Sequence, residues 1–192
     1  MYMYGRRFYL NVMNGVVSMK HFEKTVKKNN VFSGRIFSID VHEVVLENGK
    51  HAEREILSHP GGVSVIPVTE EGEIYFVKQF RKPYECEVLE IPAGKLEKGE
   101  DPECCAAREL REETGLRAAK LTYLTQMYPS PGYNDEIIHI YKAEGLEQGE
   151  VSPDEDEFVD ICKLSMEDAV AMVKSGEIKD AKTVIAILMI RL

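Results

Sequence analysis

The sequence predicts an α/β protein in which a small N-terminal region of β-strands precedes one mixed domain of strands and helices. Three observations lead to this prediction. Strand-like runs of β-branched and aromatic residues recur from Val31 onward, with turn signals between them. One helix with clear end signals follows Asp101. Two further helical segments close the chain, so helices and strands belong to one folding unit.

The first 58 residues divide into two regions. Arg6-Arg7 resembles a twin-arginine export signal, but asparagine and glycine residues interrupt the apolar segment that should follow. We therefore interpret residues 1–18 as an extension outside the core, ahead of an alternative start at Met19. Residues 19–58 are predicted to form the N-terminal β region, and residues 59–192 the main domain.

The predicted strands are arranged as hairpins. Strand structure is expected over Val31–Glu47, and Asn48-Gly49 supplies a turn before Arg54–Leu57. The string His59-Pro60-Gly61-Gly62 then interrupts the strand pattern. The later predicted strands are Val63–Val68, Ile74–Phe80, Val88–Ile91, Leu121–Met127, Glu136–Tyr141 and Phe158–Leu164.

The helix after Asp101 has recognisable signals at both ends. Asp101 is a favourable N-cap, Pro102 suits the first helical position, and Gly115 is typical of a helix C-terminus. The two closing helices are expected at Met166–Lys174 and Asp180–Ile190.

Composition excludes several classes of protein. The 192 residues include 24 Lys and Arg and 33 Asp and Glu, a net charge of −9. This surplus disfavours nucleic-acid binding and suits the binding of divalent cations. No apolar run is long enough to cross a bilayer, and four scattered cysteines are expected to be reduced thiols, so we predict a cytoplasmic globular protein. The acids of residues 144–150 are expected to form a solvated loop.

Three glutamates of the central helix occupy one face. Glu109, Glu112 and Glu113 stand at positions i, i+3 and i+4. Like charges at this spacing destabilise a helix unless a positive group compensates them, and clustered carboxylate oxygens suit Mg²⁺ or Mn²⁺. A solvated acidic face paired with Arg108 is the alternative interpretation of the glutamates alone.

The surrounding residues favour a metal site. Gly94 and Glu100 precede the string Arg108-Glu109-Leu110-Arg111-Glu112-Glu113-Thr114-Gly115-Leu116. This segment resembles the Nudix box, GX₅EX₇REUXEEXGU with U aliphatic, and every fixed position is satisfied. The resemblance implies an α/β/α sandwich with a mixed sheet and the hydrolysis of a nucleoside diphosphate linked to another moiety.

The resemblance also implies roles for residues of the box. Glu109 and Glu113 match the principal metal-ligand positions, Glu112 matches a further one, and the backbone carbonyl of Ala93 is an expected additional ligand. The cation would be Mg²⁺, with Mn²⁺ as an alternative. Arg108 is expected to hold the glutamates in place by charge-assisted hydrogen bonds.

Other motifs are similar to the ADP-ribose pyrophosphatase branch of that family. Pro131 lies fifteen residues after Leu116 within a Ser130-Pro131-Gly132 string that leads to Glu136. The resemblance extends over nearly all of residues 20–192. It includes Arg54-Glu55-Ile56, His59-Pro60-Gly61, Val77-Lys78-Gln79-Phe80-Arg81, Glu90-Ile91-Pro92-Ala93-Gly94, Asp154-Glu155-Asp156-Glu157-Phe158 and Asp180-Ala181-Lys182.

This branch implies substrate-binding roles for residues outside the box. Arg81, and less firmly Arg54, would hold phosphate or ribose groups with their guanidinium forks, and Glu136 would face the substrate. Phe37 is a candidate for the aromatic clamp on adenine, as are Phe80 and Tyr133. The general base would be Glu155 or Glu157, of which Glu155 is favoured, and Glu112 is included among the catalytic candidates.

The resemblance predicts a Mg²⁺-dependent enzyme that splits ADP-ribose into AMP and ribose 5-phosphate. It also implies a homodimer, in which strands of the N-terminal region could be exchanged between subunits. A broader hydrolase of nucleoside diphosphate sugars such as GDP-mannose is one alternative. A non-catalytic ADP-ribose sensor is another, and the intact box disfavours it.

Overall fold

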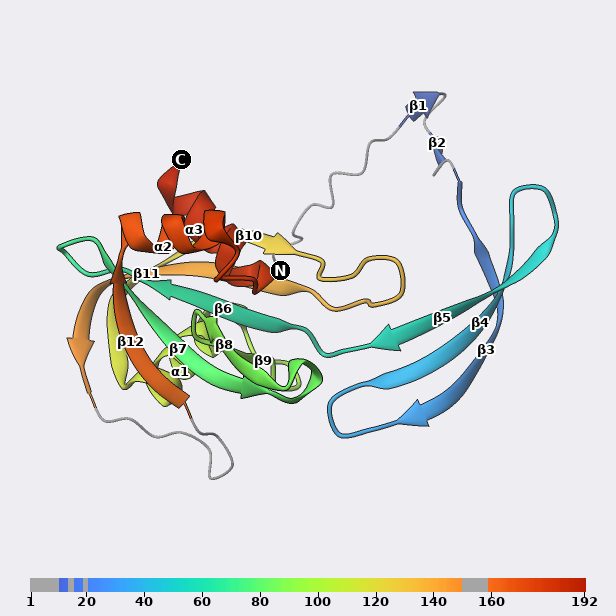
Figure 1. The fold of residues 1–192 in the computed structure, drawn as a ribbon. Coiled ribbons are helices and arrows are strands. Elements are labelled where there is room, and N and C mark those ends of the chain that lie inside the picture. Colours follow the sequence, from blue (N-terminus) through green and yellow to red (C-terminus); the bar gives the residue numbers. More distant parts are fainter. Residues whose placement is uncertain (1–10, 14–15, 19–20, 150–158) are drawn as a thin grey trace. The chain divides into compact units, whose positions relative to one another are not determined.

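The protein is described by a computed structural model, which covers residues 11–13, 16–18, 21–149 and 159–192. The chain divides into two compact units, Met1–Leu57 and Ser58–Leu192. Figure 1 shows the elements of both units. No helix in the described residues is long and apolar enough to cross a membrane.

The first unit consists of strands alone. Strands β1 (Asn11–Met13) and β2 (Val16–Ser18) pair in antiparallel fashion within the predicted extension. A separate sheet has the order β3-β4-β5, with β3 at Lys24–Ser33, β4 at Ser38–Val45 and β5 at His51–Ser58, the last residue of which falls in the second unit.

The stretch Val31–Glu47, for which strand structure is predicted, contains the end of β3 and all of β4. The chain turns between β3 and β4, where the Gly34 amide donates a hydrogen bond to the Phe37 carbonyl at 2.9 Å. Strand β3 also begins well before Val31, because the mostly polar residues 24–30 pair along β4, although all ten residues of the strand are exposed. The second turn lies at Asn48-Gly49 as expected, with Gly49 at a positive φ of 77°.

The second unit contains two sheets and three helices. One sheet has the order β10-β11-β6-β9 and the other β12-β7-β8. Their strands are β6 (Gly62–Pro67), β7 (Glu73–Arg81), β8 (Cys86–Glu90), β9 (Ala93–Lys95), β10 (Leu116–Met127), β11 (Ile138–Gln148) and β12 (Val159–Ser165). The helices are α1 (Pro102–Thr114), α2 (Met166–Ser175) and α3 (Ala181–Arg191), with a short 3₁₀ turn at Lys82–Tyr84.

The larger sheet is mixed, because β11 and β6 run parallel while its other pairs are antiparallel. Strand β6 is buried along its whole length and alternates between two cores. Val63 and Val65 pack with Leu110 of α1, whereas Ile66 packs with Ile187 of α3. Helix α1 therefore covers one face of this sheet and α3 the other. Helix α2, which lies beside α3 in Figure 1, contacts β7 and β12 of the smaller sheet.

This arrangement confirms the predicted α/β/α sandwich with a mixed sheet. The helix boundaries lie within one residue of those expected. The side chains of Asp101, Ser165 and Asp180 cap the three N-termini. The sequence does not predict strand β9, because Pro92 indicates the end of the preceding strand and only three residues follow in strand conformation.

The prediction of a solvated acidic loop at residues 144–150 is wrong for residues 144–148, which belong to a strand. Strand β11 continues to Gln148 and pairs with β10, which begins at Leu116 rather than Leu121. Lys120 and Lys142 lie 3.6 and 2.7 Å from the Glu144 carboxylate, so this acid is neutralised on the sheet.

Candidate active site

Helix α1 carries the three predicted glutamates, and its ends are held by local chemistry. The Asp101 carboxylate accepts hydrogen bonds from the amides of Glu103 and Cys104 at 3.0 and 3.3 Å. Gly115 ends the helix with a φ of 71°, a conformation that favours glycine. With both ends defined, the 3.6-residue repeat places Glu109 and Glu113 on the same side as the apolar residue Leu110.

Glu109 and Glu113 are both buried, and both face the start of β9. The Ala93 amide donates a hydrogen bond to Glu113 Oε2 at 3.0 Å. The Glu109 carboxylate lies directly against Gly94, so closely that a Cβ atom at residue 94 would overlap it. The glycine is therefore required by a close approach of side chain to backbone. Two carboxylates and one short strand thus form a compact group.

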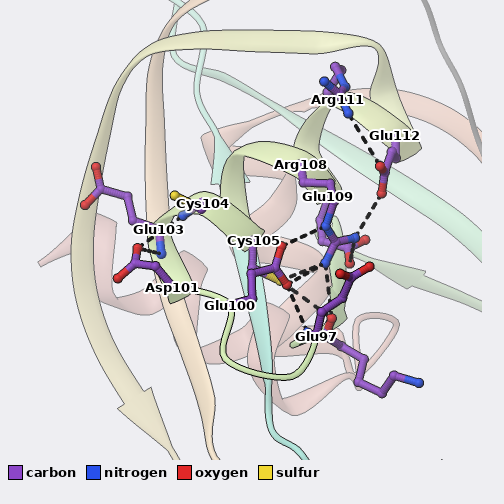
Figure 2. A network of polar contacts seen from close by, with 11 residues as sticks. Glu97, Glu100, Asp101, Glu103, Cys104, Cys105, Arg108, Glu109, Arg111 and Glu112 are labelled. Carbon is purple, nitrogen blue, oxygen red and sulfur yellow. Dashed lines mark hydrogen bonds and ion pairs between the residues drawn. The ribbon is translucent and has the colours of Figure 1, made fainter.

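Arg108 is the centre of a polar network on the same helix, which Figure 2 shows. Its Nε and Nη2 atoms donate to the two oxygens of Glu100 at 2.9 and 3.0 Å. Its Nη1 donates to Glu109 Oε1 at 2.7 Å and to Glu112 Oε2 at 3.0 Å. The guanidinium fork therefore fixes carboxylates from a loop and from two positions of the helix.

This network shifts the ionisation of its members. The hydrogen bonds from Arg108, together with the backbone amide of Glu97, lower the pKa of Glu100 to about 2. The same Glu100 contact, with the neighbouring Glu109 and Glu112, raises the pKa of Arg108 well above its ordinary value. Burial beside Glu100 raises the pKa of the Cys105 thiol to about 12, so this thiol stays protonated. At neutral pH Arg108 and Glu100 are both charged.

The donor chemistry of this group fits a divalent cation. Glu109, Glu112 and Glu113 offer hard carboxylate oxygens, and the Glu109 carboxylate can take its position because residue 94 has no Cβ. Among the described residues, no three His, Cys, Asp or Glu side chains are already gathered as a metal site. Arg108 holds oxygens of Glu109 and Glu112, so these carboxylates would change partners when a cation binds.

A pocket of about 230 Å³ adjoins these carboxylates. Ala93 and Gly94 line it on one side while they contact Glu113 and Glu109 on the other. The remaining lining residues are His59, Gly62, Val63, Arg81, Lys95, Glu136, Ile138 and Lys182. Of the predicted substrate-binding residues, the structure therefore brings Arg81 and Glu136 together with the backbone of Ala93.

Arg81 is held at this pocket by one buried carboxylate. Its Nε and Nη2 atoms donate to Glu90 Oε1 and Oε2 at 2.6 and 2.8 Å. Burial alone would raise the pKa of Glu90, but the hydrogen bonds and charges of Arg81 and Lys182 outweigh it and lower that pKa. The Glu90 contact in turn raises the pKa of Arg81. Both groups are thus ionised at neutral pH.

Glu136 lies beside a histidine that was not predicted as a site residue. His59 Nδ1 is 3.3 Å from Glu136 Oε1, and the Gly61 amide donates to the same nitrogen at 3.1 Å. Asn134 Nδ2 donates to Glu136 Oε2 at 3.2 Å. The Asn134 bond therefore holds the carboxylate of Glu136 at the pocket wall, beside the His59 ring.

His59, Lys95 and Lys182 line the pocket but were given no role from the sequence. His59 and Lys182 stand in motifs shared with the ADP-ribose pyrophosphatase branch, which was the available signal. Lys95 is a variable position of the box, and no pattern distinguishes it.

The other predicted site residues are not among those that line this pocket. Arg54 and Phe37 belong to the first unit, where Arg54 forms a bidentate pair with Glu23 at 2.6 and 2.8 Å and Phe37 contacts the Phe32 ring. Phe80 and Tyr133 are exposed. Glu155 and Glu157 lie outside the described residues.

The α/β/α sandwich, the buried glutamates of one helix and the adjoining pocket with three basic side chains fit the class of hydrolases that cleave diphosphate linkages with the help of a divalent cation. The chain belongs to the Nudix family, because the model of the NUDIX domain matches residues 58–186.

Individual proteins resemble the chain over most of its length. The ADP-ribose pyrophosphatase of Bacillus subtilis (strain 168) is 54% identical over 169 residues, which cover 86% of this chain and 90% of the relative. The methanol dehydrogenase activator of Bacillus methanolicus is 50% identical over 167 residues, with the same coverage. A crystal structure of an ADP compounds hydrolase has the same fold, with a TM-score of 0.80 and 20% identity over 92% of this chain and 95% of that one.

The lowered pKa of Glu100 predicts a pH-dependent contribution to stability. Glu100→Gln should destabilise the protein at pH 7, because the Arg108 network loses an ionised partner. A carboxylate with a lowered pKa stabilises the fold above its ordinary value of 4.5, and this stabilisation disappears as the pH falls towards about 2. The difference in the free energy of unfolding between wild type and variant should therefore shrink between pH 4.5 and 2.

Urea unfolding at pH 7, 4 and 3 measures this difference. Glu103→Gln, which changes an exposed glutamate of the same helix, controls for the loss of one negative charge. A difference that is the same at all three pH values would contradict the assignment.

Proposed function

We propose that the protein hydrolyses the diphosphate linkage of ADP-ribose to AMP and ribose 5-phosphate with Mg²⁺ as its cation, Mn²⁺ being an alternative. The observation that carries the proposal is the position of Ala93 and Gly94, which line the pocket and contact Glu113 and Glu109 at once. A diphosphate in the pocket would then lie beside the carboxylates that hold the cation. The 54% identical relative from Bacillus subtilis bears the name of this activity.

Each part of the site would contribute a separate effect. Arg81 would bind the anionic diphosphate, and Glu109, Glu112 and Glu113, with the Ala93 carbonyl, would hold Mg²⁺. The cation supplies neutralisation of charge on the diphosphate oxygens and a lowered pKa of bound water. Arg108 would keep the carboxylates oriented, and Glu136 would contact the substrate at the pocket wall. We assign the general base to Glu155, with Glu157 as the alternative.

The substrate class is tested by incubating the purified protein with Mg²⁺ and ADP-ribose, GDP-mannose and ADP-glucose in parallel, with product identification by chromatography. We expect AMP and ribose 5-phosphate, and the highest kcat/KM for ADP-ribose. Similar values for all three would support the broader hydrolase of nucleoside diphosphate sugars. Binding of ADP-ribose without any AMP would contradict the enzyme and favour a sensor.

Glu113→Gln tests the metal-binding role. The amide keeps the size of the side chain but loses the negative charge that a divalent cation requires, so kcat should fall by about 10²-fold or more. The thermal unfolding temperature should change little, because the amide oxygen can still accept the Ala93 hydrogen bond. Glu103→Gln on the same helix is the control and should keep wild-type turnover. Unchanged activity in Glu113→Gln would refute the ligand assignment.

We further propose that residues 19–58 mediate a homodimer of the main domains formed by residues 59–192, with strands exchanged between subunits. The large apolar side chains that the first unit exposes support this. They are Phe22, Val26, Val31, Phe32 and Ile36. Arg54 and Phe37 would contact substrate in that assembly. We place the protein in the cytoplasm, where its four free cysteines would stay reduced.

Light scattering coupled to gel filtration tests the dimer. The wild type should have the mass of two chains, and Val26→Asp should shift the mass towards one chain, because a charge replaces an apolar contact on β3. Lys50→Asp, at an exposed position of the β4–β5 turn, should remain dimeric. A monomeric wild type would refute the proposal.

A further inference from the structure

Lys182 occupies a position that a lysine ordinarily avoids. It lies in the first turn of α3, where the helix dipole disfavours a positive charge, and only 8% of the residue is exposed. A buried ammonium group also loses its hydration and needs charged partners. Its presence in the fold therefore depends on specific carboxylates.

Two carboxylates supply this compensation. Lys182 Nζ pairs with Glu90 Oε2 and with Asp180 Oδ1, the latter at 3.0 Å. Asp180 also accepts hydrogen bonds from the Thr183 amide and hydroxyl at 3.0 and 2.6 Å. The Ile91 amide donates to Thr183 Oγ1 at 2.9 Å. The first turn of α3 is thus tied to the end of β8 by a side-chain pair and by a bond to the backbone.

Glu90 is the link between Lys182 and the pocket. Its Oε2 atom contacts both Lys182 Nζ and Arg81 Nη2, while its Oε1 accepts from Arg81 Nε. The residue is 3% exposed, so its two cationic neighbours replace water as partners. The Arg81 side chain is 39% exposed, and its Nη1 atom donates to no acceptor among the described residues.

The charges of the group also balance. Arg81 and Lys182 carry two positive charges, and Glu90 and Asp180 carry two negative ones. Without Lys182 the group would have a net charge of −1 beside a pocket for an anion. Glu90 would also lose the ammonium that holds it, so the orientation of Arg81 would be less restricted.

We propose that Lys182 is a positioning residue for an anionic diphosphate substrate: it anchors Glu90, which holds Arg81 so that its Nη1 is available to the ligand. Lys182 lines the pocket, but its ammonium group is engaged by two carboxylates, so it acts through Arg81. The identity of the anion as ADP-ribose rests on the proposed function.

Steady-state kinetics with ADP-ribose and Mg²⁺ test the proposal. Lys182→Met should raise KM roughly tenfold and change kcat less than about twofold, because a group that orients a binding residue affects substrate and transition state similarly. Lys182→Arg keeps the charge and should restore most of the affinity. Lys179→Met removes an exposed lysine just before the same helix and should leave KM unchanged.

A double-mutant cycle distinguishes positioning from a general loss of structure. If Lys182 acts through Arg81, Lys182→Met should add less than about twofold to the KM of Arg81→Ala. The proposal would be overturned if Lys182→Met raised KM roughly tenfold both in the wild-type protein and in Arg81→Ala. It would also be overturned if Lys182→Met left the KM of the otherwise wild-type protein unchanged.

Nuclear magnetic resonance gives a readout that needs no turnover. The Nε–H signal of Arg81, assigned by its loss in Arg81→Ala, should shift or broaden in Lys182→Met and remain in Lys179→Met. An unchanged signal in Lys182→Met would overturn the proposal, whether or not the wild type produces AMP. Absence of AMP with the wild type would contradict only the proposed function. Should Lys182→Met fail to fold, Glu90→Gln carries the same test: it should raise KM and shift this signal, and no change in either would refute the link.

Discussion

The hydrogen bond from the Ala93 amide to Glu113 joins the two parts of the site. It connects β9, which forms one wall of the pocket, to the helix whose carboxylates would hold a cation. The bond depends on the close packing of α1 against the sheet. Ala106 and Leu110 of α1 are buried in this contact. A shift of the helix along the sheet would separate Glu113 from Ala93 and would also move Glu109 away from Gly94.

The segment that precedes Ala93 is held by α3. The Ile91 amide is bonded to Thr183, and Glu90 is paired with Lys182, so α3 holds the end of β8 just before the start of β9, which α1 contacts. Residues 90–94 therefore transmit the positions of both helices to the pocket. This explains why a short, mostly apolar sequence between two strands contains several of the contacts on which the site depends.

The helix and its glutamates could be predicted from the sequence because their signals are local. The cap at Asp101, the glycine at residue 115 and the spacing of the glutamates all lie within one helix. The first part of β3 is not predicted, because residues 24–30 are mostly polar and exposed and show no alternation of apolar and polar side chains. The pairs formed by Lys182 with Glu90 and by Thr183 with Ile91 each join residues 92 positions apart, which no pattern of spacing can indicate.

The net charge of −9 describes the whole surface, and the local charges of the site differ from it. On the pocket side, Arg81, Lys95 and Lys182 are opposed by Glu136 on the wall and by Glu90 and Asp180 behind it, so the two signs balance before any cation is bound. On the helix side, one guanidinium, that of Arg108, contacts Glu100, Glu109 and Glu112. Because carboxylates outnumber cations there, this side would favour a divalent ion, and the bound ion would add positive charge next to the pocket. An acidic protein can thus bind an anionic nucleotide, provided that its excess of carboxylates is placed where a metal ion converts it into a positive site.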